Sequence, residues 1–331
     1  MPANLTPAYK AAEDRYRAAT GHEEKREALR EMIALLPKHK GTEKLQADLK
    51  KKLSKLEEEE AHVARSGHHG PDPGHVHKEG AGQWVLVGPP NAGKSSLLAA
   101  LTHAHPEIAD YPFTTRAAQP GMMEFEDVQV QLVDTPAVAA GHGEVWLPSL
   151  VRGGDGVLVV VEVEADEPEA NWAAIADLLE RARIWPRGRP RPPDLSPLAV
   201  DRPVLALANK CDLDPDGTFA VLAREVIWPE LPFLPVSATR GDGLDALRPR
   251  LFHELGRIRI STKEPGHPPD PGRPFVLPAG ATVEDLARLV HGELAAKLHF
   301  ARIWGAHARF EGQQVDRHHV LEDRDVVELH A

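Results

Sequence analysis

The chain has 331 residues, of which 42% are hydrophobic and 27% are charged, and its formal net charge is −11. Such a composition is typical of a globular protein with room for two or three domains. No apolar run reaches the roughly 20 residues of a membrane-spanning helix, and the polar start is unlike a signal peptide. The acidic balance restricts any nucleic-acid binding to a local basic patch. A single cysteine excludes an internal disulfide, so we expect a cytoplasmic protein.

Residues 1–65 are rich in Ala, Glu, Lys and Leu, with apolar residues at three- and four-residue steps over 29–36 and 45–56. Such spacing places one apolar stripe on each of two helices. Pro37 and Gly41 interrupt the pattern, and Thr42 suits the N-cap of the second helix. We therefore predict a helical hairpin arm, which either packs or dimerises, or binds a partner.

Residues 66–82 contain Gly, Pro and four histidines, and we predict a linker there. No Cys or acidic cluster accompanies the histidines, so a metal site is not expected. Over 83–256, apolar segments alternate with helical ones. We predict strands at 84–88, 122–127, 128–134, 156–163, 203–210 and 232–239, and helices at 94–101, 169–183 and 243–255.

This alternation predicts an α/β domain with a mostly parallel sheet and helices on both of its faces. The Pro/Arg-rich stretch RIWPRGRPRPPDLSPLAV at 183–200 is predicted to be a loop, whose arginines are either solvated or contact RNA. Residues 257–273 are rich in proline and predict a second linker. Residues 274–331 predict a small domain with strands at 274–277, 300–305 and 326–330 and a helix at 282–294.

The segment GPPNAGKS at 88–95 fits the phosphate-loop pattern GxxxxGK[ST] between a predicted strand and a predicted helix. Backbone N–H groups of such a loop and the helix N-terminus surround phosphate oxygens. Lys94 adds a positive charge for the β- and γ-phosphates, and Ser95 adds a hydroxyl for Mg²⁺. The phosphate-binding residues expected here are Gly88, Asn91, Ala92, Gly93, Lys94, Ser95 and Ser96.

Two further segments suit a magnesium-bound triphosphate. Asp134 ends the strand VQVQLVD, where a carboxylate holds Mg²⁺ directly or through water. In YPFTT at 111–115, a threonine hydroxyl joins the metal only when a γ-phosphate is present, which makes the loop a switch. We favour Thr115 over Thr114 for this role. The expected metal ligands are thus Ser95, Thr115 and Asp134.

The motif NKCD at 209–212 follows a predicted buried strand and predicts a guanine pocket. Asp212 can accept hydrogen bonds from guanine N1–H and from its exocyclic amine. Adenine lacks both donors there and would leave a buried carboxylate unpaired, at a cost of about 1–3 kcal/mol. The base-binding residues expected are Asn209, Lys210 and Asp212, with Ser237, Ala238 and Thr239 from the next strand end.

The motifs GPPNAGKSS, YPFTT, DTPAV, NKCD and SAT resemble, in this order, those of the Obg superfamily of GTPases, and most closely its developmentally regulated GTP-binding (DRG) branch. PKHKGTEKLQADLKKKLSKLEEE is similar to the helical arm of that branch. LPAGATVEDLARLVHGEL, ARIWG and VLEDRDVVELH are similar to its TGS domain, a small β-grasp module. The resemblance implies a P-loop G domain that hydrolyses GTP, and contacts with the ribosome or RNA through the TGS domain and arm, together with a protein cofactor.

The chain departs from the DRG pattern at two places. Only the stretch around 184–202 stands where DRG proteins carry an inserted subdomain, and Ala137 replaces the glycine after DTP. Val138 stands where a water-positioning glutamine is sought, and the resemblance implies that an apolar residue there is normal for this class. Without that glutamine we expect slow hydrolysis, on the order of 10⁻⁴ per second by the Ras example. The resemblance implies a K⁺ ion that is held with help from Asn91. The expected catalytic residues are therefore Asn91, through this ion, together with Lys94 and Thr115.

Three functions remain open on these residues. The first is a slow GTPase switch associated with the ribosome or translation. The second is a GTP-dependent binding adaptor without meaningful hydrolysis, which the pair Ala137–Val138 favours. The third is an ATPase, against which Asp212 argues. From Pro274 onward nine Asp/Glu face six Lys/Arg, so RNA binding by this segment would need its basic residues gathered on one side.

Overall fold

The computed structural model describes residues 76–102, 117–139, 144–163, 165, 167–229, 231–270 and 272–331, and in the N-terminal part residues 9, 32, 33, 35 and 49. The chain divides into two compact units, Met1–Asp72 and Pro73–Ala331. Of the predicted helical hairpin at 1–65, only these five residues are described. Linker residues 66–75 and the expected switch residue Thr115 lie outside the described residues. Of the helices that are described, none is long and apolar enough to cross a bilayer.

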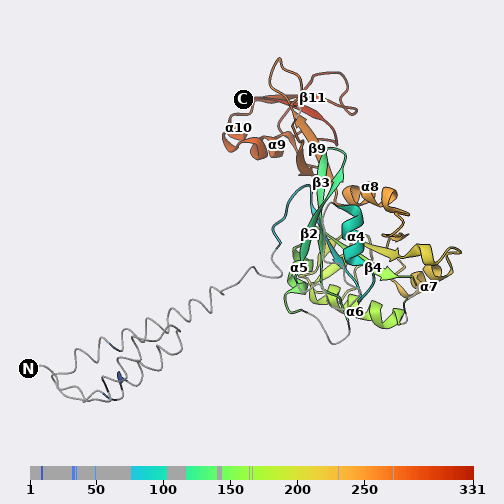
Figure 1. Ribbon diagram of the computed structural model, residues 1–331. Coiled ribbons are helices and arrows are strands. Elements are labelled where there is room, and N and C mark those ends of the chain that lie inside the picture. Colours follow the sequence, from blue (N-terminus) through green and yellow to red (C-terminus); the bar gives the residue numbers. More distant parts are fainter. Residues whose placement is uncertain are drawn as a thin grey trace, which may run out of the picture. The chain divides into compact units, whose positions relative to one another are not determined.

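The first sheet of the second unit is an α/β arrangement with helices on both faces (Figure 1). Six described strands lie in the order β2-β3-β1-β4-β7-β8, and every neighbouring pair is parallel except β2 and β3. The strands are β1 (Gln83–Val87), β2 (Gln119–Phe125), β3 (Val128–Asp134), β4 (Gly156–Glu162), β7 (Val204–Asn209) and β8 (Phe233–Pro235). The helices are α4 (Lys94–Leu101), α5 (Leu147–Gly153), α6 (Pro168–Arg181), α7 (Thr218–Val226) and α8 (Leu244–Glu254).

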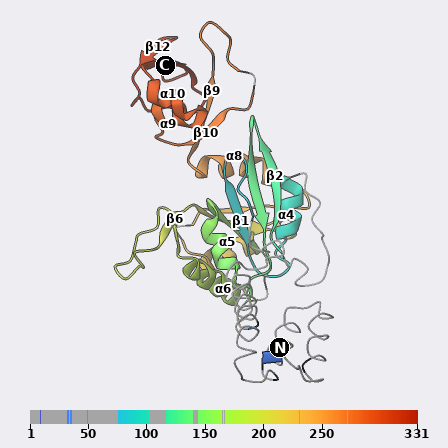
Figure 2. The same ribbon diagram turned by 90° about the vertical axis from the view of Figure 1, so that its left-hand side faces the viewer.

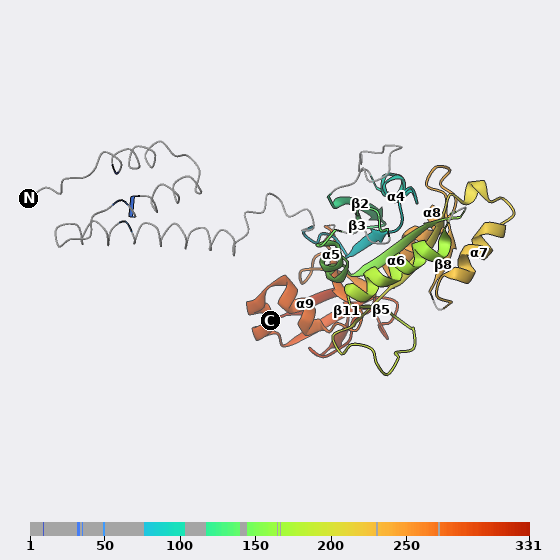
Figure 3. The ribbon, with the colours of Figure 1, turned by 90° about the horizontal axis from the view of Figure 1, so that it is seen from below.

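Strand β1 shows why this sheet is covered on both faces. All five of its residues are buried. Since side chains alternate along a strand, Trp84 joins the core cluster that includes residues of α4 and α8. Val85 joins the cluster that includes residues of α5 and α6. Figure 3 shows α5 and α6 along one side of the sheet. The expectation of a mostly parallel sheet with helices on both faces is confirmed.

Local sequence did not reveal every element of this domain. Helices α5 and α7 were not expected, and the predicted loop at 183–200 contributes to the short parallel ribbon of β5 (Ile184–Pro186) and β6 (Val200–Arg202) (Figure 2). Arginines of this segment bond within the protein: Arg191 pairs with Asp201 at 2.8 Å and Arg187 donates to the carbonyl of Glu254 at 3.0 Å. These contacts favour a structural role for the two side chains over RNA binding.

The C-terminal part forms a separate mixed sheet. Within the described residues its strand order is β10-β9-β13-β11-β12. The strands are β9 (Arg257–Thr262), β10 (Phe275–Pro278), β11 (Phe300–Trp304), β12 (Gln313–Val315) and β13 (Val326–His330), and the helices are α9 (Val283–Val290) and α10 (Gly292–Lys297). Thr282 and Asp285 form a capping box at the start of α9.

Two features of this sheet differ from the sequence-based expectation. Residues 257–262, predicted as linker, form β9, which pairs with both β10 and β13. Ile258 and Ile260 alternate with arginines and enter the core of this sheet, but the proline-rich residues that follow mask the pattern. The helix predicted over 282–294 is broken at His291, whose backbone is extended.

Candidate functional site

The ends of the parallel strands bring the predicted site residues to one edge of the first sheet. Because β1, β3, β4, β7 and β8 run in the same direction, their carboxyl ends meet there. The phosphate-loop segment follows β1, Asp134 ends β3, Glu162 ends β4, Asn209 ends β7 and Ser237 follows β8. Open parallel sheets bind ligands at this edge.

The segment 88–95 is shaped by close backbone contacts. A Cβ atom at Gly88 would lie 2.1 Å from the carbonyl oxygen of Val160. Gly93 has φ +86°, and a Cβ atom there would lie 2.2 Å from Nδ2 of Asn209. Asn91 has φ 59°, a left-handed conformation that asparagine tolerates better than most residues. Glycine is thus required at 88 and 93 because neighbouring atoms leave no room for a side chain.

Lys94 lies buried at the start of α4, 7% exposed. Its ammonium group donates to the carbonyl oxygens of Gly88 and Pro89, each at 3.0 Å. Burial lowers the pKa of Lys94 to about 8, and the nearby Asp134 carboxylate opposes that shift. The phosphate-loop segment therefore surrounds the Lys94 ammonium group, whose buried charge would be stabilised by a bound phosphate.

Ser95 and Asp134 meet as the predicted metal site requires. The Ser95 hydroxyl donates to Asp134 Oδ2 at 2.5 Å, and Asp134 is fully buried. The next residue, Thr135, is also fully buried and donates its hydroxyl to the carbonyl of Leu86 at 2.6 Å, which anchors the chain behind the carboxylate. A hydroxyl and a carboxylate in contact form an all-oxygen donor set, which suits Mg²⁺.

Val138 faces away from this edge. Its side chain is 4% exposed and belongs to the core cluster containing α5 and α6. Its backbone N–H donates to the carbonyl of Gly88 at 2.9 Å. The residue thus fixes the loop after β3 to the phosphate-loop segment, and its side chain offers nothing to orient a water molecule.

Asn209 links the phosphate-loop segment to the loop after β8. Its side-chain N–H donates to the carbonyl of Ala92 at 2.8 Å, and its side-chain oxygen accepts from the N–H of Ala238 at 3.1 Å. The residue is 1% exposed, so both bonds are shielded from water. The backbone N–H of Cys211 donates to the carbonyl of Val236 at 3.1 Å, which ties the NKCD segment to the same loop.

The carboxylate of Asp212 has the features expected of a base-binding group. Its Oδ1 atom is buried and has no hydrogen-bond partner among the described residues. Since an unpaired buried acceptor is costly, its presence marks a place where a donor from outside the chain fits. Ser237, fully buried, accepts from the N–H of Arg240 at 3.0 Å and shapes the loop that faces this segment.

Of the remaining predicted residues, Ser96 is partly buried, Thr239 is exposed, and Thr115 falls outside the described residues. Two contacts of the site were not predicted. Lys210 pairs with Glu162 at 2.7 Å, a contact that the sequence analysis did not anticipate. A polar residue closing the otherwise apolar strand GVLVVVE was the available signal, as it was for Asp134. The anchoring role of Thr135 was also missed.

The lowered pKa of Lys94 predicts a pH dependence of nucleotide binding. The ammonium form, which attracts phosphate, predominates below pH 8 and is lost above it. The affinity for fluorescently labelled GDP should therefore fall about tenfold between pH 7 and pH 9, following the protonated fraction. Lys94→Arg, which keeps its charge over this range, should bind more weakly but with a flat profile. A flat profile for the unaltered protein would contradict the assignment.

Comparison with known proteins agrees with this geometry. Residues 83–187 match the family described as 50S ribosome-binding GTPase, and residues 258–331 match the TGS domain. An uncharacterised GTP-binding protein of Halobacterium salinarum is 31% identical, covering 94% of this chain and 99% of its own. Developmentally-regulated G-protein 2 of Arabidopsis thaliana is 28% identical, covering 90% of this chain and 88% of its own. The YchF GTPase of Schizosaccharomyces pombe has a TM-score of 0.55 at 15% identity over 77% of this chain and 99% of that chain, a likeness of fold alone.

Proposed function

Because the chain belongs to the Obg/DRG-like GTP-binding proteins, with a G domain and a C-terminal TGS domain, we propose that it hydrolyses GTP slowly and acts as a ribosome-associated switch. The observation that carries the proposal is the convergence at one sheet edge of Lys94, the Ser95–Asp134 pair and the buried, unpaired Oδ1 atom of Asp212. Their spacing in the sequence is wide, and the fold brings them together.

Each group has a role in this proposal. The Lys94 ammonium and the backbone N–H groups of 88–95 hold the β- and γ-phosphates. Ser95 and Asp134, joined by Thr115 in the triphosphate state, hold Mg²⁺, which neutralises charge on the phosphates when bound. Asp212 accepts from the guanine ring. Lys210, which forms an ion pair with Glu162, is proposed to lie along the base.

Slow hydrolysis is expected because Ala137 and Val138, which follow Asp134, offer no side chain that could orient the attacking water. The side chain of Val138 is buried in the core and has no polar group that could orient a water molecule, and Ala137 is apolar as well. The same observation supports a second candidate, a GTP-dependent binding adaptor without meaningful hydrolysis. The two differ in whether a bound partner completes the site, as activating partners do for other GTPases.

Single-turnover GTP cleavage, measured with and without ribosomes, separates the two candidates. A switch should cleave GTP faster when ribosomes are present, and sedimentation with ribosomes should depend on the GTP or GDP state. An adaptor should sediment in a GTP-dependent way but leave GTP uncleaved. Failure to bind guanine nucleotide, or to sediment with ribosomes in either state, would contradict both. We propose that the TGS domain and the arm make the contacts with the ribosome or RNA, and that the protein acts in the cytoplasm.

We also expect K⁺ to accelerate GTP turnover, placed by the Asn91 side chain so that its charge offsets the charge developing on the phosphates. The left-handed backbone of Asn91 supplies a competing reason for asparagine there. Asn91→Gly separates the two, because glycine keeps the backbone conformation and removes the side chain. Turnover in K⁺ should exceed that in Na⁺ for the unaltered protein and be equal in both salts for the variant. Equal rates in the unaltered protein, or a variant that retains the K⁺ effect, would end the idea.

A further inference from the structure

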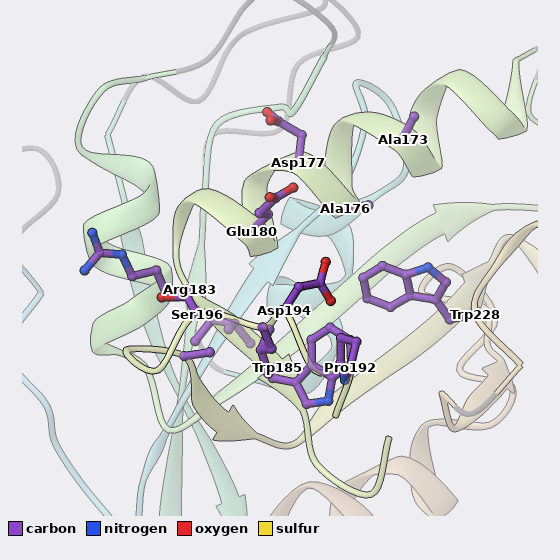
Figure 4. Close-up of a pocket in the computed structure, with 13 residues that line it drawn as sticks. Ala173, Ala176, Asp177, Glu180, Arg183, Trp185, Pro192, Asp194, Ser196 and Trp228 are labelled. Atoms are coloured by element: carbon purple, nitrogen blue, oxygen red, sulfur yellow. The ribbon is translucent and has the colours of Figure 1, made fainter. Parts of the chain in front are cut away.

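A cavity of about 540 Å³ lies between α6, the segment linking β5 to β6, and Trp228 (Figure 4). None of the residues proposed to hold the nucleotide lines it. Its volume falls in the range of small-ligand sites, roughly 300–1,000 Å³. The segment around 184–202, where this chain departs from the DRG pattern, forms one wall. This cavity is therefore a feature that the nucleotide site does not explain.

One part of the wall is aromatic. Trp185 and Trp228 line the cavity and are both partly buried. The guanidinium of Arg189 lies 4.6 Å from the ring centroid of Trp185 and 3.9 Å from that of Trp228. The Trp185 indole N–H donates to the carbonyl of Arg189 at 3.0 Å, which fixes the ring in place. These indoles already pack against a guanidinium group, an interaction that tryptophan makes better than other aromatic residues.

The rest of the charged lining is mostly negative. Asp177, Glu180 and Asp194 line the cavity. Asp177 pairs with Arg181 at 2.9 Å, whereas Glu180 and Asp194 have no ion pair within the described part of the chain. Arg183 also lines the cavity, but Figure 4 shows its guanidinium turned away from Trp228, while the carboxylate of Asp194 points toward that indole and Glu180 lies on α6.

Carboxylates beside indole faces select for a planar or compact cation. A guanidinium can bond a carboxylate through two parallel N–H groups and stack on an indole at the same time. The phosphates of RNA would be repelled by the same carboxylates. We propose that this cavity binds arginine side chains of a basic peptide segment in a partner protein. This site goes beyond the GTP-dependent function and does not depend on it.

The test uses the full chain and two peptides, tetra-arginine and its neutral isostere tetra-citrulline, both acetylated and amidated. Calorimetry should detect binding of the arginine peptide and no binding of the citrulline peptide. In the variant Glu180→Gln/Asp194→Asn the affinity should fall about tenfold, as expected for two partly exposed ion pairs. The indole N–H signals of Trp185 and Trp228 should shift on binding, while that of buried Trp84 should not.

The matched control is Glu169→Gln/Glu225→Gln, which removes the same charge from exposed positions outside the cavity. Its affinity for the arginine peptide should change by less than about twofold. Equal loss in both variants would reveal only a diffuse attraction to this acidic chain, and equal binding of both peptides would exclude cation recognition. Either result overturns the proposal. The single variant Asp194→Asn, on an exposed loop, gives the same test if the double variant does not fold.

Discussion

Replacing Asp212 with asparagine should lower the affinity for GTP by about 100- to 10,000-fold. In the proposed guanine site the carboxylate accepts two hydrogen bonds from the base, and bonds to a charged group contribute about 1.5–3 kcal/mol each. An amide presents one acceptor and one donor, so its NH₂ group faces a donor of guanine. Xanthine carries an oxygen where guanine has its exocyclic amine, so the Asp212→Asn variant should gain affinity for xanthosine triphosphate.

Equilibrium competition against fluorescently labelled GDP measures the change, with ATP as a third competitor. The matched control is Asp216→Asn, an exposed aspartate in the same segment, whose nucleotide affinities should stay within about threefold of the starting protein. Retained GTP affinity in Asp212→Asn would show that the buried Oδ1 atom serves the fold and not the base. Strong ATP competition in the unaltered protein would revive the ATPase alternative.

The sequence predicted the parts of the site that local pattern encodes. The phosphate loop needs glycine at 88 and 93 because Val160 and Asn209, distant in the chain, lie against these positions. The spacing of the two glycines in the sequence was nevertheless distinctive enough to predict the loop. Asp134 and Asn209 each stand at the end of a buried strand, and the parallel order of those strands makes their meeting predictable. The resemblance to Obg/DRG-like proteins is confirmed by the matches to the two family models and to the relatives.

The features that were missed depend on contacts between distant segments. Glu162 closes an apolar strand, which is a visible signal, but only the pairing of β4 and β7 brings it against Lys210. Strand β9 was hidden because the proline-rich stretch after it outweighed the Arg-Ile-Arg-Ile alternation. Trp185 and Trp228 lie 43 positions apart, and only the fold places them on one cavity. No local pattern carries such information.

Arg259 in β9 is the clearest case of a long-range contact with consequences for both sheets. It is 3% exposed, yet its guanidinium bonds to Asp323, Glu126 and Asp127. Glu126 and Asp127 form the turn between β2 and β3, the strand that ends at Asp134. The guanidinium also lies 4.8 Å from the ring centroid of Phe252. The β2–β3 turn is therefore joined to the C-terminal part by the buried Arg259 and by the exposed Arg324, which also bonds Glu126 at 2.5 Å.

Replacing Arg259 with methionine should destabilise the protein by about 2–3 kcal/mol. Breaking a buried pair costs roughly 3–5 kcal/mol when the partner charge stays buried, but the carboxylates here are partly exposed and regain water, which reduces the loss. Methionine keeps much of the packing against Phe252, so the change reports mainly on the charge. Urea denaturation followed by circular dichroism measures it, with Arg302→Met, an exposed arginine of β11, as the control that should change little.

The loss should depend on pH with a definite sign. Hydrogen bonds from Arg259 and then from Arg324 lower the pKa of Glu126. Hydrogen bonds from Arg259 also lower the pKa of Asp323, against the opposing effect of its own burial. The stability contributed by these pairs is therefore present above the ordinary carboxyl pKa values, near 4, and is lost as pH falls through the lowered ones. The deficit of Arg259→Met should be full at pH 7 and shrink toward pH 3. In a double-mutant cycle with Asp323→Asn the two losses should not add, because both remove the same bond. Additive losses, or a deficit unchanged at low pH, would assign the role of Arg259 to packing alone.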